Sequence, residues 1–103
     1  MIPFTPPHPP ARVQVAAQEF SFALSRPSIK AGAAIVELAN FGEDPHDLRM
    51  RRIGGTRIYA TPVVQPGDQY DLVVRLLPGK YRLWCSIADH RARGMQAVLF
   101  VRR

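Results

Sequence analysis

The sequence contains a single cysteine, Cys85, among its 103 residues. One cysteine excludes a disulfide within the chain, and it also excludes a metal centre bridged by two thiolates of the same chain. The thiol is therefore either a small buried apolar group or a reactive or metal-binding one. A chain of this length forms one domain with one core, which does not need a disulfide for stability.

The sequence also lacks a long apolar segment. No run of apolar residues approaches the length of a membrane-spanning helix. The first twenty residues have neither the basic start nor the apolar stretch of a signal peptide. We therefore expect no transmembrane segment in this chain.

Acidic residues are few, because 8 Asp and Glu stand against 14 Lys and Arg, and the formal net charge is +6. Only two of these cations, Lys30 and Lys80, are lysines. A basic balance of this kind concerns partners rather than fold. It favours acidic proteins, anionic membrane surfaces or nucleic acid as partners.

No segment shows a sustained helical period of 3.6 residues. Apolar and polar residues instead alternate in short runs, as they do in β-strands. The alternating runs lie at residues 13–15, 20–24, 48–51, 70–75 and 81–85. Turn signals such as Pro66-Gly67 and Pro78-Gly79 separate them. We predict an all-β fold of seven or eight strands, arranged as a Greek-key β-sandwich or barrel.

The first eleven residues differ in composition from the rest. They hold five prolines, which remove backbone donors and keep a chain extended. We predict a proline-rich arm or linker over residues 1–11 and a single domain over residues 12–103. We interpret His8 as a solvated linker residue rather than a metal ligand.

The segment that begins at the cysteine has the pattern C-x4-H-x4-M, formed by Cys85, His90 and Met95. A thiolate and imidazoles with a weak axial thioether are the donors of a mononuclear copper centre that transfers electrons. Such a centre needs a second imidazole. His46 can supply it from the upstream segment N-x-G-x-x-P-H-D at residues 40–47.

These motifs resemble those of the cupredoxins, a family of small blue copper proteins. The loop spacing is most similar to the auracyanin and rusticyanin type, and the resemblance covers residues 12–103. It implies a cupredoxin-like sandwich with one copper ion, held by His46, Cys85 and His90 and weakly by Met95 in the axial position. The chain departs from many relatives at Ala88-Asp89, where those relatives have Pro-Gly before the loop histidine.

The resemblance also implies a function. It implies a soluble monomeric electron carrier, not an enzyme, that cycles between Cu(I) and Cu(II) with redox proteins as partners. Cupredoxins usually work outside the cytoplasm, which implies a periplasmic or other extracytoplasmic location. Because no signal peptide is visible, the resemblance also implies that the numbered chain is a mature form or a domain taken from a longer protein. Asn40 and Asp47 are implied as hydrogen-bonding residues around the ligands, with the residue after the first histidine helping to fix the cysteine loop.

Two arginines, Arg91 and Arg93, flank the loop histidine. One interpretation is an ordinary solvated surface. The other is a basic rim that docks an acidic redox partner, because small and transient electron-transfer encounters depend on electrostatic steering. We predict the docking rim.

Two other functions remain open. One is copper storage or delivery, which would use the same ligands, or else a metal-free sandwich used only for interaction. A basic all-β domain could also be a nucleic-acid-binding barrel in which Tyr59, Tyr81 or Trp84 stacks on bases. The aromatic residues alternate as core residues do, however, and nucleic-acid binding leaves the Cys-His-Met spacing unexplained. We therefore expect no nucleic-acid partner.

Overall fold

The computed structural model describes residues 8–103, and the regular elements in that part of the chain are all β-strands. They are β1 (Ala11–Gln18), β2 (Ser21–Leu24), β3 (Ser28–Lys30), β4 (Gly32–Asn40), β5 (Arg49–Arg52), β6 (Ile58–Ala60), β7 (Gln69–Leu76), β8 (Gly79–Trp84) and β9 (Gln96–Arg102). β3 and β6 have three residues each. A strand of three residues is too short to show an alternation of apolar and polar residues, so the sequence did not indicate these two. The described residues form nine strands, whereas the sequence predicted seven or eight.

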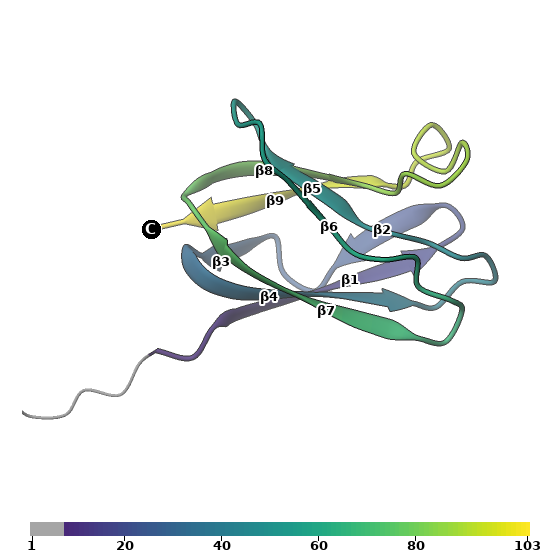
Figure 1. Ribbon diagram of the computed structural model, residues 1–103, viewed down its shortest axis with the longest axis horizontal. Helices are drawn as coiled ribbons and strands as arrows, with labels where there is room; N and C mark the ends of the chain where they lie inside the picture. Colours follow the sequence, from purple (N-terminus) through teal and green to yellow (C-terminus); the bar gives the residue numbers. More distant parts are fainter. Residues whose placement is uncertain (1–7) are drawn as a thin grey trace, which may run out of the picture.

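The strands form two sheets that pack on one another as a sandwich (Figure 1). One sheet has the order β2-β1-β4-β7 and the other the order β3-β9-β8-β5-β6. Neighbouring strands are antiparallel except for β1 with β4 and β3 with β9, which are parallel. The predicted all-β sandwich is confirmed.

The core follows from the alternation of side chains along the central strands. Val13 and Val15 of β1 point inward and are fully buried, as the sequence predicted. Tyr81 and Leu83 of β8 do the same, and Cys85 continues the buried series directly after the strand. Burial of apolar surface between the two sheets is the main stabilising contribution to such a fold.

Among the connections at the end of the sandwich opposite the C-terminus, three surround the predicted ligands (Figure 1). They are the β1–β2 turn, the β4–β5 connection and the β8–β9 connection. The last two contain the residues that the sequence singled out as metal ligands. The topology therefore brings both motifs to one end of the molecule.

The N-terminal prediction concerns residues that are mostly outside the described part of the chain. His8 is exposed and β1 begins at Ala11, but residues 1–7 are not described. The division into an arm and a domain stays a prediction. Within residues 8–103, no helix is long and apolar enough to cross a membrane.

Candidate metal centre

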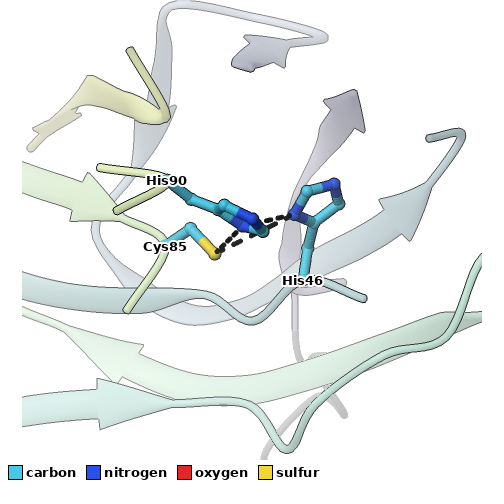
Figure 2. A group of neighbouring side chains, drawn as sticks. All are labelled: His46, Cys85 and His90. Atoms are coloured by element: carbon cyan, nitrogen blue, oxygen red, sulfur yellow. Dashed lines mark hydrogen bonds between the residues drawn. The ribbon is translucent and has the colours of Figure 1, made fainter. Parts of the chain in front are cut away.

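Three of the predicted ligands converge at this end of the sandwich. One donor atom from each of His46, Cys85 and His90 lies within 4.8 Å of the other two, and all three residues are buried. Figure 2 shows Sγ of Cys85 and the two imidazoles pointing toward one another from separate segments. The structure thus gathers residues that are far apart in the sequence into one cluster.

The spacing of the donor atoms suits a single metal ion. Nδ1 of His46 lies 3.3 Å from Nδ1 of His90, and Sγ of Cys85 lies 4.0 Å and 3.7 Å from these two nitrogens. Bonds of about 2.0 Å to nitrogen and about 2.3 Å to sulfur, arranged trigonally, would separate nitrogens by about 3.5 Å and nitrogen from sulfur by about 3.7 Å. The cluster therefore fits one ion of a first-row transition metal without rearrangement of the backbone.

The fourth predicted ligand, Met95, is held beside the cysteine by the strand pairing. Trp84 of β8 is opposite Gln96 of β9. The backbone N–H of Cys85 then donates to the carbonyl of Met95 at 3.1 Å, which extends the ladder by one step. The Met95 side chain is fully buried. The ladder thus places the cysteine and the methionine next to each other at the base of one loop.

The loop between these two residues is closed by its own hydrogen bonds. The backbone N–H of Met95 donates to the carbonyl of His90 at 3.1 Å, and that of His90 donates to the carbonyl of Ile87 at 3.0 Å. Ala88 has a φ of 47° in the left-handed region. Gly94 has a φ of 126°, and a Cβ there would lie 2.9 Å from a carbonyl oxygen of the neighbouring turn. Glycine is therefore required where the loop turns back into β9.

His46 is oriented by a residue that the sequence did not point to. Nε2 of His46 donates to Oε1 of Glu19, in the β1–β2 turn, at 3.0 Å. An ionised carboxylate only accepts hydrogen bonds, so Nε2 carries the proton and Nδ1 presents its lone pair to the cluster. A carboxylate that orients a metal-binding histidine in this way is a common feature of metal sites.

Glu19 also fixes the segment that precedes His46. Its carboxylate accepts the backbone N–H of Asp44 at 2.6 Å and that of Glu43 at 2.9 Å. The bond from Asp44 is the main cause that lowers the pKa of Glu19, and those from Glu43 and His46 add to it; together they lower it from 4.5 to about 2. Glu19 is therefore ionised at neutral pH. Nothing in the local sequence signals this role, which depends on how two distant connections pack.

Asn40 and Asp47, the two predicted supporting residues, hold the loops on either side of the cluster. The Asn40 side chain donates to the carbonyls of Asp44 and Val64 at 2.8 and 3.0 Å. Asp47 accepts the backbone N–H of Ser86 at 2.6 Å and also bonds the Ser86 hydroxyl. Because Ser86 follows the cysteine directly, Asp47 ties the first-histidine segment to the cysteine loop.

Burial is the main cause that raises the pKa of the Cys85 thiol. Without a metal, the sulfur is therefore protonated at neutral pH. A bound cation would supply the positive charge that favours the thiolate.

Aromatic and basic side chains surround His90. The ring of Phe20 lies 5.0 Å from the His90 ring, although the sequence placed Phe20 within a strand rather than in the β1–β2 turn. Arg93 lies over Phe20 and donates to Asp89 at 2.7 Å, while Arg91 lies over the Trp84 ring. Both predicted docking arginines are exposed near His90, and their role stays a prediction.

Solved structures with the same architecture were found, although no protein-family model and no curated protein matches the sequence. A dithionite-reduced auracyanin from Roseiflexus castenholzii is 19% identical with a TM-score of 0.71, over 89% of this chain and 97% of that one. A purple cupredoxin from Nitrosopumilus maritimus is 20% identical with a TM-score of 0.62, over 85% of this chain and 97% of that one. This chain has the cupredoxin fold. The resemblance inferred from the sequence is confirmed for the fold.

The cupredoxin fold also occurs inside larger proteins. A multicopper oxidase is 17% identical with a TM-score of 0.63, over 87% of this chain but only 41% of the oxidase. The fold by itself therefore does not separate a carrier from a domain of an enzyme, and function has to be argued from the site.

Proposed function

We propose that this protein carries single electrons on one copper ion bound by His46, Cys85, His90 and Met95. The observation that carries the proposal is the buried triangle of two Nδ1 atoms and one Sγ atom with sides of 3.3, 3.7 and 4.0 Å. Two imidazoles and a thiolate with a weak thioether are the donor set of mononuclear electron-transfer copper. The solved neighbours, an auracyanin and a purple cupredoxin among them, support the same assignment.

Copper, when bound, supplies reversible one-electron chemistry between Cu(I) and Cu(II). The residues of the chain contribute rigidity. His46 is fixed by Glu19, and Cys85 is fixed by the β8–β9 ladder and through Ser86. A site whose donors cannot move changes little in geometry when the charge of the ion changes, which lowers the cost of each transfer.

The burial of the cluster supports a carrier over copper storage or delivery. His46 is 0% exposed, Cys85 1% and Met95 0%, whereas His90 is 7% exposed. A delivery protein needs copper that exchanges, and a closed site opposes exchange. His90 lies nearest to solvent, so we infer that its edge is the point of electron entry and exit.

The site also supports a carrier over an enzyme. Four protein donors fill the coordination of one ion, whereas catalytic metal sites keep an open position for substrate. We further infer that the protein acts as a monomer outside the cytoplasm with a redox protein as its partner. Arg91 and Arg93 form the proposed contact for an acidic partner.

Metal analysis and voltammetry together test this proposal. The protein loaded with Cu(II) and desalted should hold one copper per chain and give one reversible one-electron wave. It should also keep its copper against a moderate chelator over many cycles. Rapid loss of copper would favour delivery, and the absence of a reversible wave would contradict electron transfer.

A further inference from the structure

Positive charge is concentrated on one of the two sheets. The strands of the five-stranded sheet contain no Asp or Glu within the described residues. The same strands contain these cations: Lys30, Arg49, Arg51, Arg52, Lys80, Arg82 and Arg102. The four-stranded sheet is balanced, with Arg12 and Arg75 against Glu37 and Asp71. The net charge of the protein is therefore carried mainly by one layer of the sandwich.

Several of these cations are placed directly opposite one another. Arg51 of β5 is opposite Arg82 of β8, and Lys30 of β3 is opposite Arg102 of β9. All four side chains are exposed, and among residues 8–103 no carboxylate forms an ion pair with any of them. Like charges in directly opposed positions destabilise a sheet. The stability of the fold therefore does not account for the arrangement, which fits an anionic partner.

Exposed apolar side chains lie among these cations. Phe100 of β9 is 49% exposed and has the Lys80 ammonium 5.6 Å from its ring centre. Ile53 is 47% exposed in the β5–β6 connection, which rises from the outer side of this sheet in Figure 1. The backbone N–H of Ile53 donates to the carbonyl of Lys80 at 2.8 Å, which keeps the base of this connection against β8.

We propose that the basic face, defined as Lys30, Arg51, Lys80, Arg82 and Arg102, binds the surface of a bilayer that contains anionic lipids. The cations would contact lipid phosphates, and Ile53 and Phe100 would enter the interfacial layer. Cations together with apolar side chains are what peripheral membrane binding requires. This inference goes beyond the proposed electron transfer and does not depend on it.

The structure favours a bilayer over nucleic acid. The cations are spread over four strands of a broad sheet, β3, β5, β8 and β9, which matches an extended planar surface. Single-stranded nucleic acid needs open aromatic faces on which bases stack. Here the Arg91 guanidinium lies 4.7 Å from the centre of the Trp84 ring and the Arg57 guanidinium lies 4.8 Å from that of Tyr59, so neither ring is open on that side. Contact with phosphates alone would also leave Ile53 without a role.

Vesicle flotation of the full chain tests the proposal. The protein, both metal-free and copper-loaded, is mixed with vesicles of phosphatidylcholine alone or of phosphatidylcholine with phosphatidylglycerol. We expect binding only to the anionic vesicles, in both forms of the protein. Binding should weaken between about 0.1 M and about 1 M salt, because the screening length falls from about 10 to about 3 Å. Because the metal-free protein is included, this result is independent of whether copper binds.

Charge-matched variants locate the binding surface. Arg51→Glu with Arg82→Glu should lower the affinity for anionic vesicles by about thirtyfold or more, since each cation near such a surface contributes about a fivefold factor. Arg12→Glu with Arg75→Glu makes the same change of charge at exposed positions of the other sheet and should have a much smaller effect. Ile53→Ser should weaken binding by about threefold or more while the salt dependence remains.

A second pair of substitutions at the same two positions keeps the test decisive if the double glutamate variant does not fold. Arg51→Gln with Arg82→Gln removes the repulsion, and it should raise the melting temperature while it weakens vesicle binding. Equal binding to neutral and anionic vesicles would overturn the proposal, as would equal losses in the two charge-matched variants. Binding to a DNA duplex without binding to anionic vesicles would also overturn it, in favour of nucleic acid.

Discussion

Glu19 accepts a hydrogen bond from Nε2 of His46 at 3.0 Å, across a sequence separation of 27 residues. The same carboxylate binds the backbone of the segment that leads to His46. It therefore sets both the position of the imidazole and the nitrogen that faces the other ligands. The β1–β2 turn is thus part of the proposed metal centre, although it contributes none of the proposed ligands.

Replacement of Glu19 should weaken the metal centre. Glu19→Ala removes the acceptor, and loss of such an outer hydrogen bond lowers metal affinity by about tenfold to a hundredfold. Glu19→Gln keeps an acceptor oxygen and should recover part of that loss. The measurement is competitive copper titration, with Glu43→Ala as the control because Glu43 is exposed and has the same charge. Equal affinities for Glu19→Ala and the control would show that Glu19 does not position His46.

The fold and the clustering of the proposed ligands could be predicted from the sequence because their signals are local. Cys85, His90 and Met95 lie within one short loop, and the alternation at Tyr81 and Leu83 fixes which way the cysteine points. Local spacing of residue types and the two-residue period of a strand are both visible along the chain. These signals were sufficient to predict a β-sandwich, and they indicated the residues that we propose as ligands.

The remaining features depend on packing between segments far apart in the sequence. The contact of Glu19 with His46 requires the β1–β2 turn to meet the β4–β5 connection. The pairing of Arg51 with Arg82 depends on the register of β5 against β8. Phe20 starts the period-two pattern of residues 20–24 but lies in the turn against His90, because β2 begins only at Ser21. The alternation along a strand shows which face each residue occupies, but it does not show which residue of a distant strand lies opposite.

The axial position can be tested with a conservative substitution. Met95→Leu conserves volume at a fully buried site, so the fold should remain at a cost below about 1.5 kcal/mol. Copper should stay bound, and the reduction potential should rise because Cu(II) loses a donor. Met50→Leu, at a buried methionine of β5 outside the cluster, is the voltammetric control and should leave the potential unchanged. Loss of copper or a lower potential in Met95→Leu would argue against a weak axial role.

Stability at alkaline pH should depend on Tyr81. Burial is the main cause that raises the pKa of Tyr81 above its usual value of about 10. The folded state therefore holds the phenol proton more tightly than the unfolded state does. This contribution to the free energy of unfolding is complete below pH of about 10 and is lost as the pH rises further.

Tyr81→Phe separates this effect from other alkaline titrations. The variant loses the hydrogen bond from the hydroxyl to the Leu77 carbonyl, so it should be less stable by about 1 kcal/mol at neutral pH. Its stability should fall less steeply than that of the parent above pH of about 10, so the two values should converge. Urea unfolding from neutral pH to above pH of about 10 measures the stability of the parent and the variant. Tyr70→Phe, at an exposed position, is the control. Parallel curves for parent and Tyr81→Phe would contradict the assignment.

The two proposed docking arginines should differ in their effect on the rate of reduction by a partner protein. Arg93 is paired with Asp89 at 2.7 Å, whereas Arg91 lies over the Trp84 ring without a carboxylate partner among the described residues. Arg91→Glu should therefore slow reduction by an acidic redox protein more than Arg93→Glu does. The loss should shrink as salt screens the charges. Stopped-flow kinetics over a salt series measures these rates, with Arg12→Glu on the other sheet as the control. If both variants react at the same rate as the control, Arg91 and Arg93 belong to an ordinary solvated surface.

The central claim is that one copper ion binds to the thiolate of Cys85 together with His46 and His90. The most direct test is the visible absorption spectrum of the protein during titration with Cu(II), compared with that of Cys85→Ser. We predict an intense thiolate-to-copper band that reaches its maximum at one equivalent in the parent. In Cys85→Ser the band should be absent while the circular dichroism of the β-sandwich is retained. A parent protein without the band, or a Cys85→Ser spectrum that matches the parent, would contradict the account.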